Sequence, residues 1–131
     1  MFKRKIDIRW RDLDALGHVN NAVYATYLEE ARDRWLMQTL EGITPITEFV
    51  LAHVSINYKS EILFNDLSVT VTCHPLRIGN SSVTTSEIIT KSDGTLAANA
   101  EAVMVARDIE TGRSRPLNFN EQSALKNQLV D

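Results

Sequence analysis

The sequence has a single cysteine, Cys73, and no long run of apolar residues. One cysteine excludes an internal disulfide and any zinc site built from several cysteines. The longest unbroken apolar run is five residues, 102–106, whereas a membrane-spanning helix needs about 20. Charged residues follow the basic start at 3–5, where a signal peptide would have its apolar core. We therefore expect a cytoplasmic protein that is neither a membrane protein nor a secreted one.

A basic surplus is also missing, since 14 Lys and Arg residues stand against 17 Asp and Glu residues, a net charge of -3. Nucleic-acid-binding domains usually carry positive charge gathered in one patch, so we expect no nucleic-acid partner. The 131 residues fit a single domain, 1–131, because domains usually have about 100–200 residues. Composition thus predicts an ordinary globular domain and indicates no particular chemistry.

Several common catalytic motifs are absent from the sequence. It contains no G-x-S-x-G turn, no P-loop, no G-x-G-x-x-G and no H-E-x-x-H. Cys73 falls on the apolar phase of a predicted strand, which favours a small core residue. His53 and His74 fall on polar phases and are expected to face solvent. We therefore expect neither a metal nor a cofactor.

The hydrophobic pattern predicts one long helix and several strands. Residues 5–11 alternate between apolar and polar, as in a half-buried strand. Residues 22–40 contain neither Gly nor Pro and repeat apolar residues at helical spacing. Further strands are expected at 50–58, 67–74, 82–91 and 95–107, and a short helix at 120–129. The order β-α-β-β-β-β predicts an α+β protein of the hotdog type, with an antiparallel sheet curled around one helix.

The same periods predict which side chains are buried. Alternation places Ile6, Ile8 and Trp10 together on the inner face of the first strand. Helical spacing gathers Tyr24, Leu28, Ala31 and Trp35 on the buried face of the long helix. The opposite face is expected to carry charged side chains, namely Glu29, Glu30, Arg32, Asp33 and Arg34.

The loop before the long helix has the composition of a reactive site. Residues 12–21 contain Asp12, Asp14, His18, Asn20 and Asn21. A helix N-terminus carries about half a positive charge and free N–H groups, so it can polarise a carbonyl oxygen. A carboxylate beside it could attack the carbonyl or activate a water, as in acyl transfer. Strand-to-helix loops also use Asp, Gly and Asn as turn and cap residues, so the residues alone leave both interpretations open.

The segment RWRDLDALGHVNNAVYATYLEEARDRWL, residues 9–36, resembles the opening of hotdog-fold acyl-CoA thioesterases of the 4-hydroxybenzoyl-CoA thioesterase type. The shared pattern is D-x-D-x-x-G-H-V-N-N, then a tyrosine, then E-x-A-R. Weaker similarity continues through AHVSINYKSEI at 52–62, LRIGNSSV at 76–83 and the Asp93-Gly94 hairpin. The resemblance therefore covers most of residues 5–118.

This resemblance implies hydrolysis of an acyl-CoA or acyl-carrier-protein thioester, with Asp14 as nucleophile or general base. The thioester carbonyl would face the N-terminus of the long helix, and Asp12 is expected to be a loop or ion-pair residue. The family's active sites lie between subunits, which implies a homodimer or a homotetramer. The expected supporting or substrate-binding residues are Gly17, His18, Asn20, Asn21, Tyr24 and Arg77.

Arg77 is included because some relatives place basic side chains at 76–82, where they meet coenzyme A phosphates. It is the only basic residue of that segment here. The alternative to an enzyme is a hotdog module that binds an acyl ligand without reacting. The sequence leaves open the acyl group, the carrier and the choice between nucleophile and general base.

Overall fold

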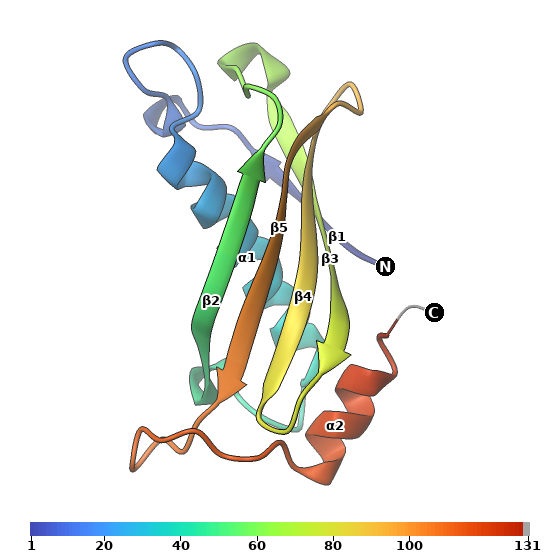
Figure 1. The fold of residues 1–131 in the computed structure, drawn as a ribbon. Helices are drawn as coiled ribbons and strands as arrows, with labels where there is room; N and C mark the ends of the chain where they lie inside the picture. Colours follow the sequence, from blue (N-terminus) through green and yellow to red (C-terminus); the bar gives the residue numbers. More distant parts are fainter. Residues whose placement is uncertain (130–131) are drawn as a thin grey trace.

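The computed structural model describes residues 1–129 and packs one long helix, α1 (Asn21–Thr39), against one face of a five-stranded antiparallel sheet (Figure 1). The strand order is β1-β3-β4-β5-β2. A short helix, α2 (Phe119–Lys126), lies at the end of the sheet where β3 finishes (Figure 1). The strands are β1 (Phe2–Asp7), β2 (Phe49–Tyr58), β3 (Ser68–Ile78), β4 (Ser82–Lys91) and β5 (Leu96–Ala106). The predicted α+β hotdog arrangement is confirmed.

Local sequence signals account for most element boundaries. Asn20 caps α1, and Gly42 with a φ of 77° follows the helix end. The predicted Asp93-Gly94 hairpin is present between β4 and β5, and Gly94 has a φ of 89° that favours glycine. The terminal helix is found at 119–126, so it begins one residue earlier and ends three residues earlier than expected.

The first strand begins three residues and ends four residues earlier than predicted, and Trp10 does not lie in the core. β1 ends at Asp7, and residues 10–12 form a turn of 3-10 helix. The Asp12 carboxylate accepts the Arg9 amide at 2.9 Å, which turns the chain away from the sheet. Ile6 and Ile8 are buried as expected, but Trp10 is 74% exposed and packs edge-on against Phe64 at 5.8 Å.

The prediction for Arg32 is also wrong, because this side chain lies in the core. Its guanidinium donates two hydrogen bonds to the Glu87 carboxylate of β4, at 2.8 and 2.9 Å. The Thr85 hydroxyl donates a third bond to Glu87 at 2.6 Å. Arg32 is 2% exposed and Glu87 is 0% exposed. This ion pair therefore joins α1 to the middle of the sheet through fully paired charges.

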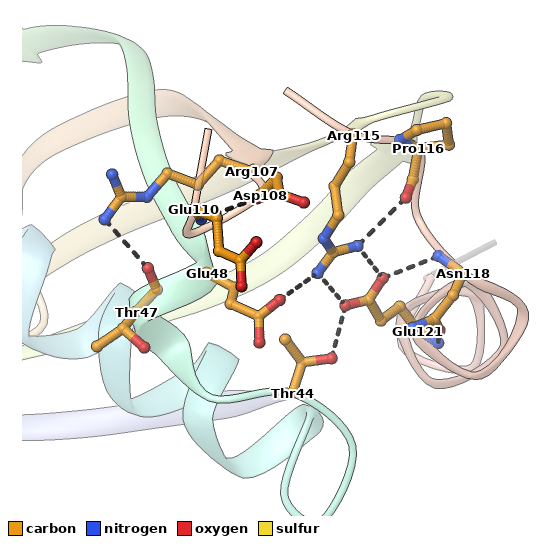
Figure 2. Close-up of polar contacts among 10 residues, drawn as sticks. All are labelled: Thr44, Thr47, Glu48, Arg107, Asp108, Glu110, Arg115, Pro116, Asn118 and Glu121. Carbon is orange, nitrogen blue, oxygen red and sulfur yellow. Dashed lines mark hydrogen bonds and ion pairs between the residues drawn. The ribbon is translucent and has the colours of Figure 1, made fainter. Parts of the chain in front are cut away.

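The C-terminal helix is held by a second buried carboxylate, that of Glu121 (Figure 2). Arg115 donates two bonds to it at 2.9 Å, and the Thr44 hydroxyl donates one at 2.6 Å. Burial by itself would raise the pKa of Glu121, but the bonds from Arg115 and Thr44 outweigh it and lower the pKa to about 2. Leu125 packs into the core from the same helix. The contacts fix α2 to the turn that follows α1.

No helix within residues 1–129 is both long enough and apolar enough to cross a membrane.

Candidate active site

Residues 12–20 form a short hairpin at the N-terminal end of α1. Its two arms pair through bonds from the Asn20 amide to the Asp12 carbonyl at 2.8 Å and from the Asp14 amide to the His18 carbonyl at 2.7 Å. The tip is a turn in which the Gly17 amide donates to the Asp14 carbonyl at 3.1 Å. Gly17 has a φ of 84°, a conformation that favours glycine. The sequence D-A-L-G-H thus builds a tight loop that begins and ends close to the helix.

The half-buried Asp14 carboxylate lies at the tip of this hairpin. Its Oδ1 atom accepts the amides of Leu16 at 2.9 Å and His18 at 3.2 Å. Oδ2 accepts no hydrogen bond from any residue of 1–129. One oxygen is therefore fixed by the loop, and the other remains available to a ligand.

The two asparagines begin α1 directly after the hairpin. The Asn20 side chain caps the helix by accepting the Ala22 amide at 2.9 Å, and the Asn21 carbonyl accepts the Tyr58 hydroxyl at 3.1 Å. Both asparagines are exposed. The positive end of the helix dipole consequently lies at the base of the loop that carries Asp14.

A small pocket of about 210 Å³ lies beside the same helix end. The Tyr24 hydroxyl donates to the Ser60 carbonyl at 3.0 Å, and its ring meets Tyr58 edge-on at 5.0 Å. Burial raises the pKa of Tyr24, so its hydroxyl stays a proton donor at neutral pH. The pocket is lined by Asn21, Tyr24, Tyr58, Lys59, Ser60 and Glu61.

His18 joins the hairpin to the segment that follows β2. Its Nε2 atom lies 3.4 Å from a Glu61 carboxylate oxygen, and its backbone forms an isolated bridge with Leu63. The next residue, Val19, donates its amide to the Ile62 carbonyl at 2.8 Å. One arm of the hairpin, residues 18–19, is therefore fixed to residues 61–63.

Arg77 is the predicted site residue that the chain does not bring to this loop. It lies near the far end of β3, whose first residue, Ser68, pairs with Asp7 next to the loop. Arg77 lies nine positions after Ser68 along this strand, a span of roughly 30 Å. The Arg77 guanidinium is exposed and lies 3.9 Å from Glu101.

Sequence reasoning missed Tyr27, and of its two alternatives for Asp12, a loop or an ion-pair residue, the structure shows the first. The Asp12 carboxylate forms no ion pair within residues 1–129; it accepts the Tyr27 hydroxyl at 2.6 Å and the Arg9 amide at 2.9 Å. The only signal for Tyr27 was its position three residues after Tyr24, which puts both rings near one helix face. Helical spacing predicts which face of α1 carries Tyr27, but it does not predict that the hydroxyl of Tyr27 binds Asp12.

The hollows of greatest volume in the described structure do not lie at the hairpin. Three hollows of about 460 Å³ lie away from the hairpin: between α1 and β1, beside residues 37–47 and on the outer face of the sheet. None of them is lined by Asp14 or by the start of α1. In the described part of the chain, no group of three or more His, Cys, Asp or Glu side chains could hold a metal ion. A free carboxylate oxygen on a hairpin whose base adjoins a helix N-terminus makes this hairpin the candidate active site.

A sequence model of the Thioesterase-like superfamily matches residues 8–128. The chain belongs to this superfamily. It is 31% identical over 121 residues to the long-chain acyl-CoA thioesterase FadM of Escherichia coli K12, covering 86% of this chain and 88% of that protein. The resemblance found in residues 9–36 is thereby confirmed, and so is the predicted enzyme class, a thioester hydrolase.

Solved structures of this superfamily share the fold. A thioesterase from Thermus thermophilus, complexed with coenzyme A and Zn, is 32% identical with a TM-score of 0.86, covering 96% of this chain and 92% of its own. A putative acyl-CoA thioesterase from Xanthomonas campestris is 36% identical with a TM-score of 0.73, covering 88% and 97%. Thioesterase-like proteins thus match this chain over nearly its full described length.

Proposed function

We propose that this thioesterase-like protein hydrolyses acyl-CoA thioesters to a free acid and coenzyme A, with Asp14 as its reactive group. The observation that carries the proposal is the Asp14 carboxylate, which has one oxygen held by two loop amides and the other free. The hairpin that carries this carboxylate leads directly into the N-terminal end of α1, which adjoins the base of the hairpin. A thioester carbonyl directed at that end would have a polarising dipole on its oxygen and a carboxylate near its carbon.

Two routes use the same geometry. In the nucleophilic route, Asp14 Oδ2 attacks the carbonyl carbon, the C–S bond breaks to release the thiolate, and water then hydrolyses the mixed anhydride. In the general-base route, Asp14 takes a proton from the water that attacks the carbonyl. We favour the nucleophilic route because aspartate side chains usually have a pKa of about 4 and are weak bases. A single turnover in oxygen-18 water with enzyme in excess distinguishes the two routes, because label enters the Asp14 carboxylate only when water attacks the Asp14 carbonyl of the anhydride. An Asp14 hydroxamate formed with hydroxylamine is the second probe.

Coenzyme A is the carrier that the relatives support. The E. coli relative is a long-chain acyl-CoA thioesterase, and the T. thermophilus relative was crystallised with coenzyme A. We infer that Tyr24 and Asn21, which line the pocket at the start of α1, contact the part of the substrate nearest the thioester. Gly17 and His18 shape the loop that holds Asp14.

Thiol release from a panel of acyl-CoAs tests the reaction. We expect turnover of at least one short, long or aromatic acyl-CoA, measured as free thiol with a thiol reagent. A protein that binds acyl-CoA in calorimetry but releases no thiol would instead be the non-catalytic acyl-binding module. Palmitoyl and benzoyl thioesters are each assayed on coenzyme A and on acyl-carrier protein. This comparison distinguishes a preference for the carrier from a preference for the acyl group.

We further infer that a second copy of the chain completes the site. β2 is an edge strand of ten residues, so one side of its backbone has no strand partner within residues 1–129. Its side chains Leu51 and Tyr58 are 44% and 48% exposed. Long apolar edges of this kind tend to pair with another strand. Antiparallel pairing of β2 with its copy would bring the Phe49 end of the partner sheet, where Arg77 also lies, toward Asp14.

Activity should therefore depend on the dimer. We expect the specific activity to fall, not merely the stability, when the protein is diluted into the range where light scattering or sedimentation shows monomers. Addition of coenzyme A should move this range to lower concentration, because a ligand of the shared site stabilises the assembly that binds it. A monomer with full specific activity contradicts this inference.

A further inference from the structure

The Tyr27 hydroxyl makes a short hydrogen bond from the core to the candidate catalytic loop. Tyr27 lies in the second turn of α1 and is 4% exposed. Its hydroxyl donates to Asp12 Oδ2 at 2.6 Å, across 15 positions of sequence. Hydrogen bonds to charged acceptors at this distance are about twice as strong as neutral ones.

Asp12 is the residue at which the hairpin begins. Its carboxylate accepts the Arg9 amide at 2.9 Å, and its carbonyl accepts the Asn20 amide at 2.8 Å. Asp14 follows two residues later on the same arm. An interaction that holds Asp12 in place therefore also restrains the arm that carries the Asp14 carboxylate.

The two arms of the hairpin are attached to different parts of the protein. Residues 18–19 bind residues 61–63 through backbone contacts. In the part of the chain that the structure describes, residues 12–14 have no such backbone partner outside the hairpin, apart from the local turn at 9–13. Within the described residues, Tyr27 supplies the side-chain hydrogen bond that ties this arm to α1.

We propose that Tyr27 is a positioning residue for hydrolysis: by holding Asp12, it fixes the Asp14 carboxylate relative to the N-terminus of α1. The inference rests on the reactive role proposed for Asp14. Tyr27 itself touches neither substrate nor reacting atoms in this arrangement. Burial, followed by the bond to Asp12, raises the pKa of Tyr27, so the hydroxyl remains a donor at every assay pH.

Tyr27→Phe removes the hydroxyl and keeps the ring in the core. A misplacement of about 1 Å of a reacting group can cost about 100-fold in rate. Since the hairpin retains its other contacts, we expect kcat to fall by about 10-fold or more, with KM changed by no more than about twofold because the pocket lining is intact.

Thr44→Val is the matched control for stability. Thr44 also donates a 2.6 Å hydrogen bond from its hydroxyl to a carboxylate, that of Glu121 (Figure 2). Glu121 belongs to α2, which lies at the opposite end of the molecule from the start of α1 (Figure 1). Both variants should lower the melting temperature, but only Tyr27→Phe should lower kcat. If kcat of Tyr27→Phe stays within twofold of wild type, or falls no further than that of Thr44→Val, the proposal is wrong.

A double-mutant cycle tests whether Tyr27 acts through Asp12. We compare Tyr27→Phe, Asp12→Ala and the double variant in the same kcat assay. If the hydroxyl works only by holding Asp12, the double variant is no slower than Asp12→Ala. If the kcat losses of the two single variants multiply in the double variant, Tyr27 acts independently of Asp12 and the inference is wrong.

Amide hydrogen exchange separates this inference from the proposed function. The amides of Leu16 and His18 donate to Asp14, so their exchange reports the state of the loop without any substrate. We expect Tyr27→Phe to speed their exchange and Thr44→Val to leave it unchanged. An active Asp14→Asn variant would reject Asp14 as the reactive group, whereas unchanged exchange in Tyr27→Phe would reject the positioning role.

Discussion

Replacing Asp14 by asparagine is expected to lower kcat by about 100-fold or more while the protein stays folded. Asparagine has nearly the same volume, and its Oδ1 can still accept the two amides that hold the aspartate, those of Leu16 and His18. The change is therefore confined to the free oxygen, which becomes an uncharged NH₂ group. A neutral amide can neither attack the thioester carbonyl nor take a proton from water.

The chain offers a matched control for this variant. Asp108 also accepts two loop amides through Oδ1, those of Glu110 at 2.8 Å and Thr111 at 3.0 Å. It lies in an exposed loop after β5, away from the start of α1. We expect Asp108→Asn to retain wild-type kcat, and Asp12→Asn to be milder than Asp14→Asn because asparagine can still accept the Tyr27 hydroxyl.

Steady-state thiol release for the three variants, together with circular dichroism and melting temperature, decides the assignment. A folded Asp14→Asn protein with turnover within a few-fold of wild type would place the reactive group elsewhere. The comparison with Asp108 also isolates what is special about Asp14. Both carboxylates share the local turn, but Asp14 lies on the loop that leads into α1, whereas Asp108 lies in the loop after β5.

The sequence was sufficient for the fold because periodicity reports burial directly. Alternation at 67–74 and helical spacing at 22–40 follow from which faces contact the core. The failures occurred where side-chain hydrogen bonds override the pattern. Trp10 continues the alternation of Ile6 and Ile8, yet Asp12 ends the strand by accepting the Arg9 amide. Such a bond cannot be read from hydrophobicity.

The site was predictable as a segment but not as a set of contacts. The loop 12–21 stood out by composition, and the structure does gather its residues at the start of α1. The partner of Asp12 was missed because Tyr27 belongs to a different element, and its hydroxyl meets the loop only in three dimensions. Arg77 was grouped with the loop by resemblance, although strand geometry separates them within one chain.

The buried pair of Arg32 and Glu87 shows the same limit. Glu87 shares the inward phase of β4 with Val83, Thr85 and Ile89, and this alternation was the available signal. Charged residues are almost never fully buried unless they are paired. Considered separately, Arg32 and Glu87 are therefore each predicted to face solvent. Only the register between α1 and β4 reveals that the charges meet.

Breaking this pair should be the most destabilising single change in the protein's polar core. Glu87→Gln keeps the side-chain shape but leaves the Arg32 charge buried without its counterion. Removing one partner of a buried ion pair typically costs about 3–5 kcal/mol. Urea unfolding at one fixed protein concentration measures the loss, because the stability of an oligomer depends on concentration.

Glu30→Gln is the control on the same helix. Arg4 and Glu30 also join the sheet to α1, at 3.3 Å, but their side chains are 41% and 36% exposed. Exposed pairs contribute about 0–1 kcal/mol, so this variant should remain near wild type. The double variant Arg32→Met/Glu87→Met should recover much of the stability lost in Glu87→Gln, because it removes both charges and fills the space with apolar side chains. If Glu87→Gln costs no more than Glu30→Gln, water must reach Arg32, and the pair is not the closed, dry contact that its burial indicates.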